Sequence, residues 1–147
     1  MDTKIRGFTL IEVLLSVTII STMVGLSLPM YHAYNNRNDL DLTSQAVAEM
    51  MRRAMTYSRG MRLDDSWAVH IETSSATLFK GVAYATRDVS FDETTTIPSS
   101  FTVSGLLDVS FAKLTGLPST TGATTISIPD TTESRSVMLN GEGVVSY

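Results

Sequence analysis

The sequence of 147 residues has no cysteine, only two histidines, and 11 basic side chains against 15 acidic ones. Without cysteine, the chain has no disulfide, no thiolate nucleophile and no cysteine ligand for zinc. His32 and His70 alone leave few routes to general-base or metal chemistry. The formal net charge of −4 argues against a general nucleic-acid binder, because phosphate neutralisation requires clustered lysine and arginine in excess. These absences disfavour most enzyme classes, and the length allows one modest domain.

The acidic residues do not form a recognisable metal site. The pair at 64–65, and Asp88 with the pair at 92–93, lack the spacing of a regular calcium loop, so we interpret them as solvated loop acids. His70 has no carboxylate at ligand or triad spacing, and no nucleophile motif accompanies it, so we interpret it as an edge or partly buried histidine. The sequence therefore predicts no catalytic residue, no metal ligand and no cofactor.

The apolar residues are concentrated near the N-terminus, where Glu12 is the only charged residue between positions 8 and 28. A helix of this length is roughly 31 Å long, which matches the hydrocarbon thickness of a bilayer. Lys4 and Arg6 precede the apolar stretch, which predicts a cytoplasmic N-terminus and an extracytoplasmic remainder. The stretch is too long for an ordinary signal peptide and lacks a small-residue cleavage site. A generic single-span anchor would explain the length but not Glu12, because a charge in lipid is costly.

The run Gly7-Phe8-Thr9-Leu10-Ile11-Glu12 resembles the prepilin signature of type IV pilins and type II secretion pseudopilins. The resemblance implies that a prepilin peptidase cuts after Gly7 and methylates the new amine of Phe8. It also implies that the Glu12 carboxylate pairs with the Phe8 amine of a neighbouring subunit, and that Pro29 kinks the helix. The implied partners are the peptidase, other pilin or pseudopilin subunits, an inner-membrane assembly platform and, before assembly, membrane lipid. An unprocessed anchor that happens to contain Glu12 is the alternative.

Beyond Pro29, apolar residues recur at roughly helical spacing, which predicts an amphipathic helix that continues the first one with a bend. Gly60 is a plausible C-terminal stop, with Arg59 placed to oppose the negative end of the helix dipole. We expect Met50, Met51 and Met55, packed around the small Ala54, to fill an irregular core between helix and sheet rather than to form a metal or redox stripe. The apolar positions are Leu40, Val47, Met50, Met51, Ala54, Met55 and Met61.

The same segment carries the only basic cluster of the exported part, formed by Arg52, Arg53, Arg59 and Arg62. A solvated helix face is its ordinary interpretation. A contact with nucleic acid or with a partner is the alternative.

From Thr73 onward, hydroxyl residues dominate, and short β-branched or aromatic runs alternate with turn residues, which indicates strands and turns. Asn140-Gly141 predicts a hairpin between the last two strands, because both residues tolerate positive φ. We expect loops at 94–96 and 119–121, where hydroxyls could accept O-linked sugars. The predicted strands are 67–72, 76–80, 101–104, 108–112, 124–128, 134–139 and 144–147.

The C-terminal region also resembles the GspH/FimT-like minor pseudopilins and minor pilins. The motifs that carry this narrower resemblance occur in the expected order: Val109-Ser110-Phe111, Gly116-Leu117-Pro118, Gly122, Ile126-Ser127-Ile128, Val137-Met138-Leu139-Asn140 and Gly143-Val144-Val145. Two features depart from the pattern. Residues 113–115 replace a frequent proline, and the terminal strand at 143–147 lacks the basic residues that DNA-binding members use.

Together these patterns predict an α+β protein of the type IV pilin kind. We expect a leader at 1–7, a transmembrane and filament-packing helix at 8–29, an amphipathic helix at 30–62, and an exported antiparallel β domain at 63–147 with two small packed sheets. The predicted function is that of a non-enzymatic minor pilin or pseudopilin of a type IV pilus or type II secretion filament. A DNA-binding minor pilin for DNA uptake and a membrane-tethered enzyme are the alternatives, although the acidic composition disfavours nucleic acid as a partner. The expected location is the cell membrane in a single pass, followed by an extracellular or periplasmic filament.

Overall fold

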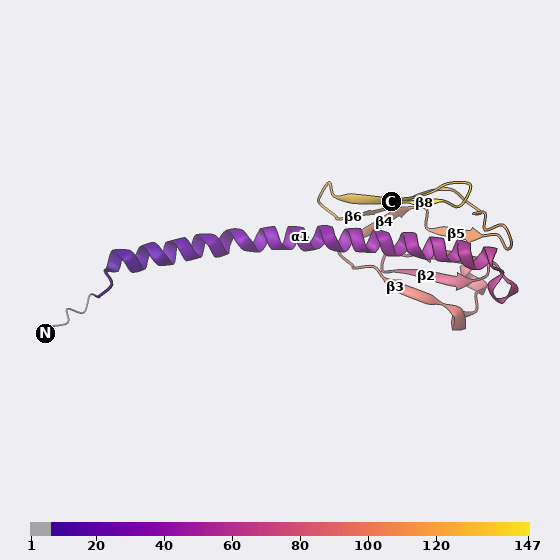
Figure 1. The fold of residues 1–147 in the computed structure, drawn as a ribbon, viewed down its shortest axis with the longest axis horizontal. Helices are drawn as coiled ribbons and strands as arrows, with labels where there is room; N and C mark the ends of the chain where they lie inside the picture. The colour runs from indigo at the N-terminus through magenta and orange to yellow at the C-terminus, as the bar shows by residue number, and fades with distance from the viewer. Residues whose placement is uncertain (1–6) are drawn as a thin grey trace. The chain divides into compact units, whose positions relative to one another are not determined.

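The computed structural model describes residues 7–147, apart from the side chains of residues 26–30, 32 and 33. A long helix precedes a region built of strands, which confirms the predicted α+β class (Figure 1). The chain divides into two compact units between Asn36 and Arg37. The elements are α1 (Leu10–Arg59), η1 (Arg62–Asp64), β1 (Trp67–Ile71), β2 (Ser75–Lys80), η2 (Tyr84–Thr86), η3 (Val89–Phe91), β3 (Glu93–Thr96), β4 (Thr102–Gly105), β5 (Asp108–Phe111), β6 (Gly122–Ser127), β7 (Ser134–Leu139) and β8 (Val145–Ser146).

Helix α1 begins immediately after Thr9, which occupies the N-cap position. The backbone N–H of Glu12 donates to the Thr9 hydroxyl at 3.4 Å and to the Thr9 carbonyl at 3.1 Å. Threonine followed three residues later by glutamate is the spacing of a capping box. The family-signature residues therefore also specify where the helix starts.

The first part of α1 is apolar and exposed. Every residue from Gly7 to Gly25 is exposed, including Leu10 at 80% and Ile11 at 73%. Helical structure continues through residue 29, where the predicted kink stays a prediction. Among the described residues, no helix has the length and hydropathy needed to cross a membrane.

The last part of α1 has one fully buried face. Leu40, Val47, Met51 and Ala54 have at most 1% exposure and belong to a single hydrophobic core with residues of both sheets. Met50 is 5% exposed in the same core, so these methionines fill the space between helix and sheet as expected. The helix ends at Arg59, immediately before the predicted stop.

The strands form two four-stranded antiparallel sheets, with the orders β3-β2-β1-β5 and β4-β6-β7-β8. All seven predicted strands are present with small changes of boundary. The loop expected at residues 94–96 is wrong, because these threonines form most of β3 and pair with β2. Threonine is β-branched and favours a strand when a partner strand is available, and the Thr94 and Thr77 hydroxyls lie 3.3 Å apart.

The turn between β7 and β8 is the predicted hairpin. Leu139 pairs with Val145 across it. The Asn140 side-chain oxygen accepts from the backbone N–H groups of Glu142 at 3.0 Å and Val144 at 2.8 Å. An asparagine side chain thus organises the turn by replacing backbone acceptors.

Candidate functional site

The predicted cleavage bond lies between Gly7 and Phe8, just before the first turn of α1. Both residues are non-helical and exposed, and Phe8 is 81% exposed. A protease binds its substrate as an extended segment, so a bond outside the helix needs no unwinding before it can be cut. A side chain at position 7 would meet no atom within 4 Å, so the fold itself does not require glycine there. Lys4 and Arg6, which we expect to orient insertion, lie outside the described residues.

The Glu12 carboxylate lies on the first turn of α1, where negative charge is favourable near the positive end of the helix dipole. Within residues 7–147 it forms no ion pair. Its neighbours Phe8, Leu10, Val13 and Leu14 line a shallow apolar hollow on the helix surface. The N-terminal site is therefore one unpaired acid on an exposed apolar helix, next to an accessible peptide bond.

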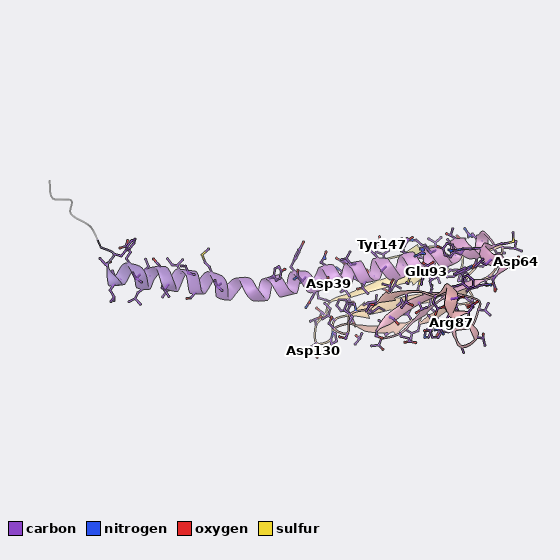
Figure 2. The ribbon with its side chains drawn as sticks, turned by 90° about the horizontal axis from the view of Figure 1, so that it is seen from below. Asp39, Asp64, Arg87, Glu93, Asp130 and Tyr147 are labelled. Atoms are coloured by element: carbon purple, nitrogen blue, oxygen red, sulfur yellow. The ribbon has the colours of Figure 1, made fainter. Side chains whose placement is uncertain are left out.

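The four arginines of the predicted basic patch each contact another part of the chain, and the partner of Arg53, Glu93, is labelled in Figure 2. Arg52 donates to the Val145 carbonyl at 2.9 Å. Arg59 donates through Nε to the Thr115 carbonyl at 2.9 Å.

The other two arginines contact aromatic rings. Arg62 lies over the rings of Tyr57 at 4.1 Å and Trp67 at 5.2 Å. Arg53 bonds the Tyr57 hydroxyl at 3.0 Å and forms an ion pair with Glu93. The hydrogen bond to Tyr57 and the pairing with Glu93 raise the pKa of Arg53. These contacts give the four arginines a role in joining α1 to the strands, and they do not favour a nucleic-acid surface.

His70 has two carboxylate neighbours that were not foreseen. Its Nδ1 lies 2.5 Å from Asp108 Oδ1, and its Nε2 lies 3.2 Å from Glu72 Oε1. Strand pairing places Asp108 directly opposite His70. His70 is partly buried, with 20% of its side chain exposed, as the sequence predicts. Its carboxylate partners were missed: Glu72 lies two residues further along the chain, whereas Asp108 depends on the register of β1 against β5, which sequence spacing does not provide. The Tyr84 ring stacks on the imidazole, with 3.9 Å between centroids.

This histidine cluster has no nucleophile at Nε2 and does not converge on a metal. The two carboxylates lie at opposite ring nitrogens of His70, so they cannot both join the imidazole on one ion. Across the part of the chain that the structure describes, no three histidine, aspartate or glutamate side chains are placed to bind a metal ion.

Of the acids interpreted as solvated loop acids, Asp64 and Asp88 are exposed as expected, whereas Asp92 has only 12% of its side chain exposed and Glu93 lies in β3. All of them have polar partners within the chain. Arg87 binds Asp92 at 2.7 Å, and this pairing raises the pKa of Arg87. The Lys113 ammonium lies 2.5 Å from Asp64 and holds the pKa of that carboxyl below its usual range. Hydrogen bonds from Ser90 lower the pKa of Asp88 in the same way. The remaining two acids are also paired, Asp65 with Lys80 and Glu93 with Arg53.

One protein-family model matches the chain, and its description is prokaryotic N-terminal methylation motif. The match covers residues 2–28. The chain carries a prepilin-type N-terminal motif. No curated protein and no solved structure matches the chain.

The prepilin-type motif contains all three residues of the N-terminal site, Gly7, Phe8 and Glu12. It supports the resemblance to pilins and pseudopilins, and it implies processing by a prepilin peptidase and assembly with other subunits. It ends before the core-forming part of α1, so the GspH/FimT-like resemblance of the C-terminal region stays a prediction.

Proposed function

We propose that this chain is a minor pilin or pseudopilin, a structural subunit of a type IV pilus or a type II secretion-like filament. The observation that carries the proposal is the prepilin-type motif on the exposed apolar stretch at residues 8–25, whose only acid, Glu12, forms no ion pair within residues 7–147. An apolar surface of this extent is not stable in water, so it belongs in lipid or against other helices.

In the proposed pathway, residues 8–29 first reside in the membrane with the N-terminus in the cytoplasm. Prepilin peptidase cuts between Gly7 and Phe8 and methylates the Phe8 amine. Removal of the leader leaves 9 basic and 14 acidic side chains, a formal charge of −5.

Assembly then transfers the apolar helix from lipid to the filament core. The Glu12 carboxylate of an incoming subunit pairs with the Phe8 amine of a subunit already in place, and this charge neutralisation sets the axial register. In a low-dielectric surrounding, an unpaired carboxylate is far more costly than a paired one, so the pairing selects one register over its neighbours. Pro29 provides a bend where the helix leaves the membrane, and the assembly platform supplies the direction of growth.

The proposal is tested by the N-terminal mass of the protein purified from membranes of cells that contain a prepilin peptidase. We expect a chain that starts at N-methylated Phe8. Gly7→Ala should leave the leader attached. Gly25→Ala is the matched control, since an added Cβ at Gly25 also meets no atom within 4 Å, and it should be processed normally. An intact Met1 start, or cleavage at another bond, would make the chain a tethered surface domain instead.

A further inference from the structure

The two sheets have four edge strands, and three of these edges are protected. β3 carries Glu93, which forms an ion pair with Arg53 of α1. The outer side of β5 is covered by the turn that follows it, because the Ser110 carbonyl accepts from the backbone N–H of Ser119 at 2.8 Å. β8 has two residues. Charged, covered and very short edges are the usual ways in which a protein keeps a sheet from pairing with another chain.

The fourth edge strand, β4, lacks charge and cover. It ends the sheet of order β4-β6-β7-β8, and within residues 7–147 no strand pairs with its other side. Thr102, Ser104 and Gly105 are exposed, and no charged residue occurs between positions 97 and 107. An edge strand presents unpaired N–H and C=O groups, so β4 is an open template for an added strand.

The chain crosses from one sheet to the other directly after β4. The Leu106 N–H donates to the Ala123 carbonyl of β6 at 2.9 Å. The Leu107 carbonyl accepts from the Ile71 N–H of β1 at 2.8 Å. A cavity of about 470 Å³ lies beside this crossing, within the size range of ligand sites, and Val103, Leu107 and Ile71 provide its apolar lining. A side chain from a strand added to β4 therefore has a place to be buried.

Negative charge prevails around this cavity. Glu72 belongs to the lining, and its side chain is 49% exposed. Asp108, 67% exposed, lies on the other side of the His70 imidazole. In the part of the chain that the structure describes, no lysine or arginine lines the cavity, and Arg87, which Glu72 also attracts, is paired with Asp92 at 2.7 Å. The two carboxylates therefore outnumber the cations even when the imidazole is protonated.

We propose that β4 binds an extended segment of a different protein, which pairs with it as an added strand and places a lysine or arginine side chain in the cavity beside Glu72. Main-chain hydrogen bonds supply the affinity in such a contact, and the pocket for alternate side chains supplies the specificity. A charge-assisted hydrogen bond to a carboxylate is stronger than one between neutral groups, so a cation is the preferred occupant. The inference goes beyond the proposed function, since it depends on neither leader cleavage nor Glu12.

Disulfide capture of a synthetic peptide tests the contact, because the native chain has no cysteine. Ser104→Cys, in the full chain in detergent, places one thiol on the exposed side of β4. The probe is the peptide acetyl-TVTCKTVT-amide, in which alternation directs the lysine to the face opposite the cysteine and so toward the cavity. The captured fraction, measured by intact mass in a thiol–disulfide buffer, reports the relative affinity of each peptide.

Three further peptides separate strand pairing from charge. One has glutamate in place of lysine. The other two are N-methylated at alternate backbone nitrogens, at the odd or at the even positions, because only one of these sets can face β4 in an added strand. We expect the lysine peptide to be captured at least fivefold more than the glutamate peptide, and one N-methylated peptide but not the other to lose capture at least fivefold. Glu72→Gln in the same background should reduce the lysine preference at least threefold and leave the difference between the N-methylated peptides unchanged.

Ser136→Cys is the matched control. Ser136 is also exposed and lies in the same cross-strand row, since Thr125 pairs with both Ser104 and Ser136, but its strand β7 lies between β6 and β8. It should capture the two N-methylated peptides equally, and the lysine and glutamate peptides within twofold of each other.

Equal capture of all four peptides by Ser104→Cys, or a preference for the glutamate peptide, would overturn the proposal. So would a disulfide-linked dimer of Ser104→Cys that forms in place of the peptide adduct, because a second copy of the chain would then occupy β4. The N-terminal mass of the same samples reports on the proposed function, so a correctly processed chain that fails these tests refutes only this inference.

Discussion

Two stretches of the single helix α1 contain similar residues but bury them differently. Between residues 8 and 25 the apolar side chains are exposed on every side, whereas Leu40, Val47 and Met51 are fully buried against the strands. Charges follow the same division, since every arginine and lysine of residues 37–147 has a partner within the chain and Glu12 has no ion-pair partner among the described residues. The second stretch completes a fold, whereas nothing in the described chain covers the first.

Truncating one leucine in each stretch of α1 should give the largest difference in the free energy of unfolding. Leu40→Ala removes a side chain with 0% exposure and should lower the free energy of unfolding of the core by about 2–5 kcal/mol. Leu14→Ala, at 54% exposure, should change it by less than about 0.5 kcal/mol. Urea unfolding in detergent, followed by the fluorescence of Trp67, measures both. Equal losses in the two variants would mean that the first stretch also packs within the chain.

The hairpin asparagine tests whether polar groups of the second unit are satisfied internally. Asn140→Ala removes the acceptor of two backbone N–H groups and should cost about 1 kcal/mol. Asn140→Asp keeps an acceptor oxygen and is the matched control. The same unfolding assay applies, and a variant as stable as the parent would show that water replaces both bonds.

The contrast between the exposed and the buried stretch of α1 also explains which parts of the fold and of the site can be predicted from the sequence. The N-terminal site is contiguous, because a peptidase reads adjacent residues, so Gly7, Phe8 and Glu12 can be found without a fold. Helical spacing predicts the buried face of the last part of α1, and alternation predicts seven strands. In contrast, the Asp108 partner of His70 depends on strand register, and β3 depends on the presence of β2.

The partners of the arginine cluster were missed for the same reason. Arg53 meets Glu93 on β3, a strand that was not predicted, and Arg59 meets a turn more than fifty residues away. A basic cluster on a helix gives no indication of which carbonyls or carboxylates the fold brings to it. Ion pairs between distant segments are therefore the part of this site that needs a structure.

Backbone strain in the segment that follows α1 predicts a smaller change in stability, in which a glycine substitution stabilises the fold. Leu63 is in the left-handed region with φ at 57°, so Leu63→Gly should raise the free energy of unfolding by about 0.5 kcal/mol. Leu42→Gly makes the same change in a helix at similar exposure and should lower it by about 1 kcal/mol. Chemical unfolding of both variants provides the comparison, and a loss of stability in each would argue that Leu63 is not strained.

The smallest predicted effect is a pH dependence of stability that comes from Asp64. Lys113 lowers the pKa of this carboxyl in the folded state from its ordinary 3.8, so the pair stabilises the fold above that pH and the contribution is lost as the pH falls through the folded value. Asp64→Asn should therefore melt slightly below the parent at pH 6 and together with it at pH 2. Thermal unfolding at both values tests this, and a difference that persists in acid would assign the effect to something other than charge.

The central claim is that Glu12 finds its cation in a neighbouring subunit. The most direct measurement compares Glu12→Gln with the parent chain in cells that assemble filaments, recording the N-terminal mass and the fraction of subunits in the filament. The account predicts normal cleavage and methylation at Phe8 but at least a tenfold loss of incorporation, with Glu49→Gln, a change at another exposed acid of α1, behaving as the parent. A Glu12→Gln chain that is processed and incorporated normally would contradict it.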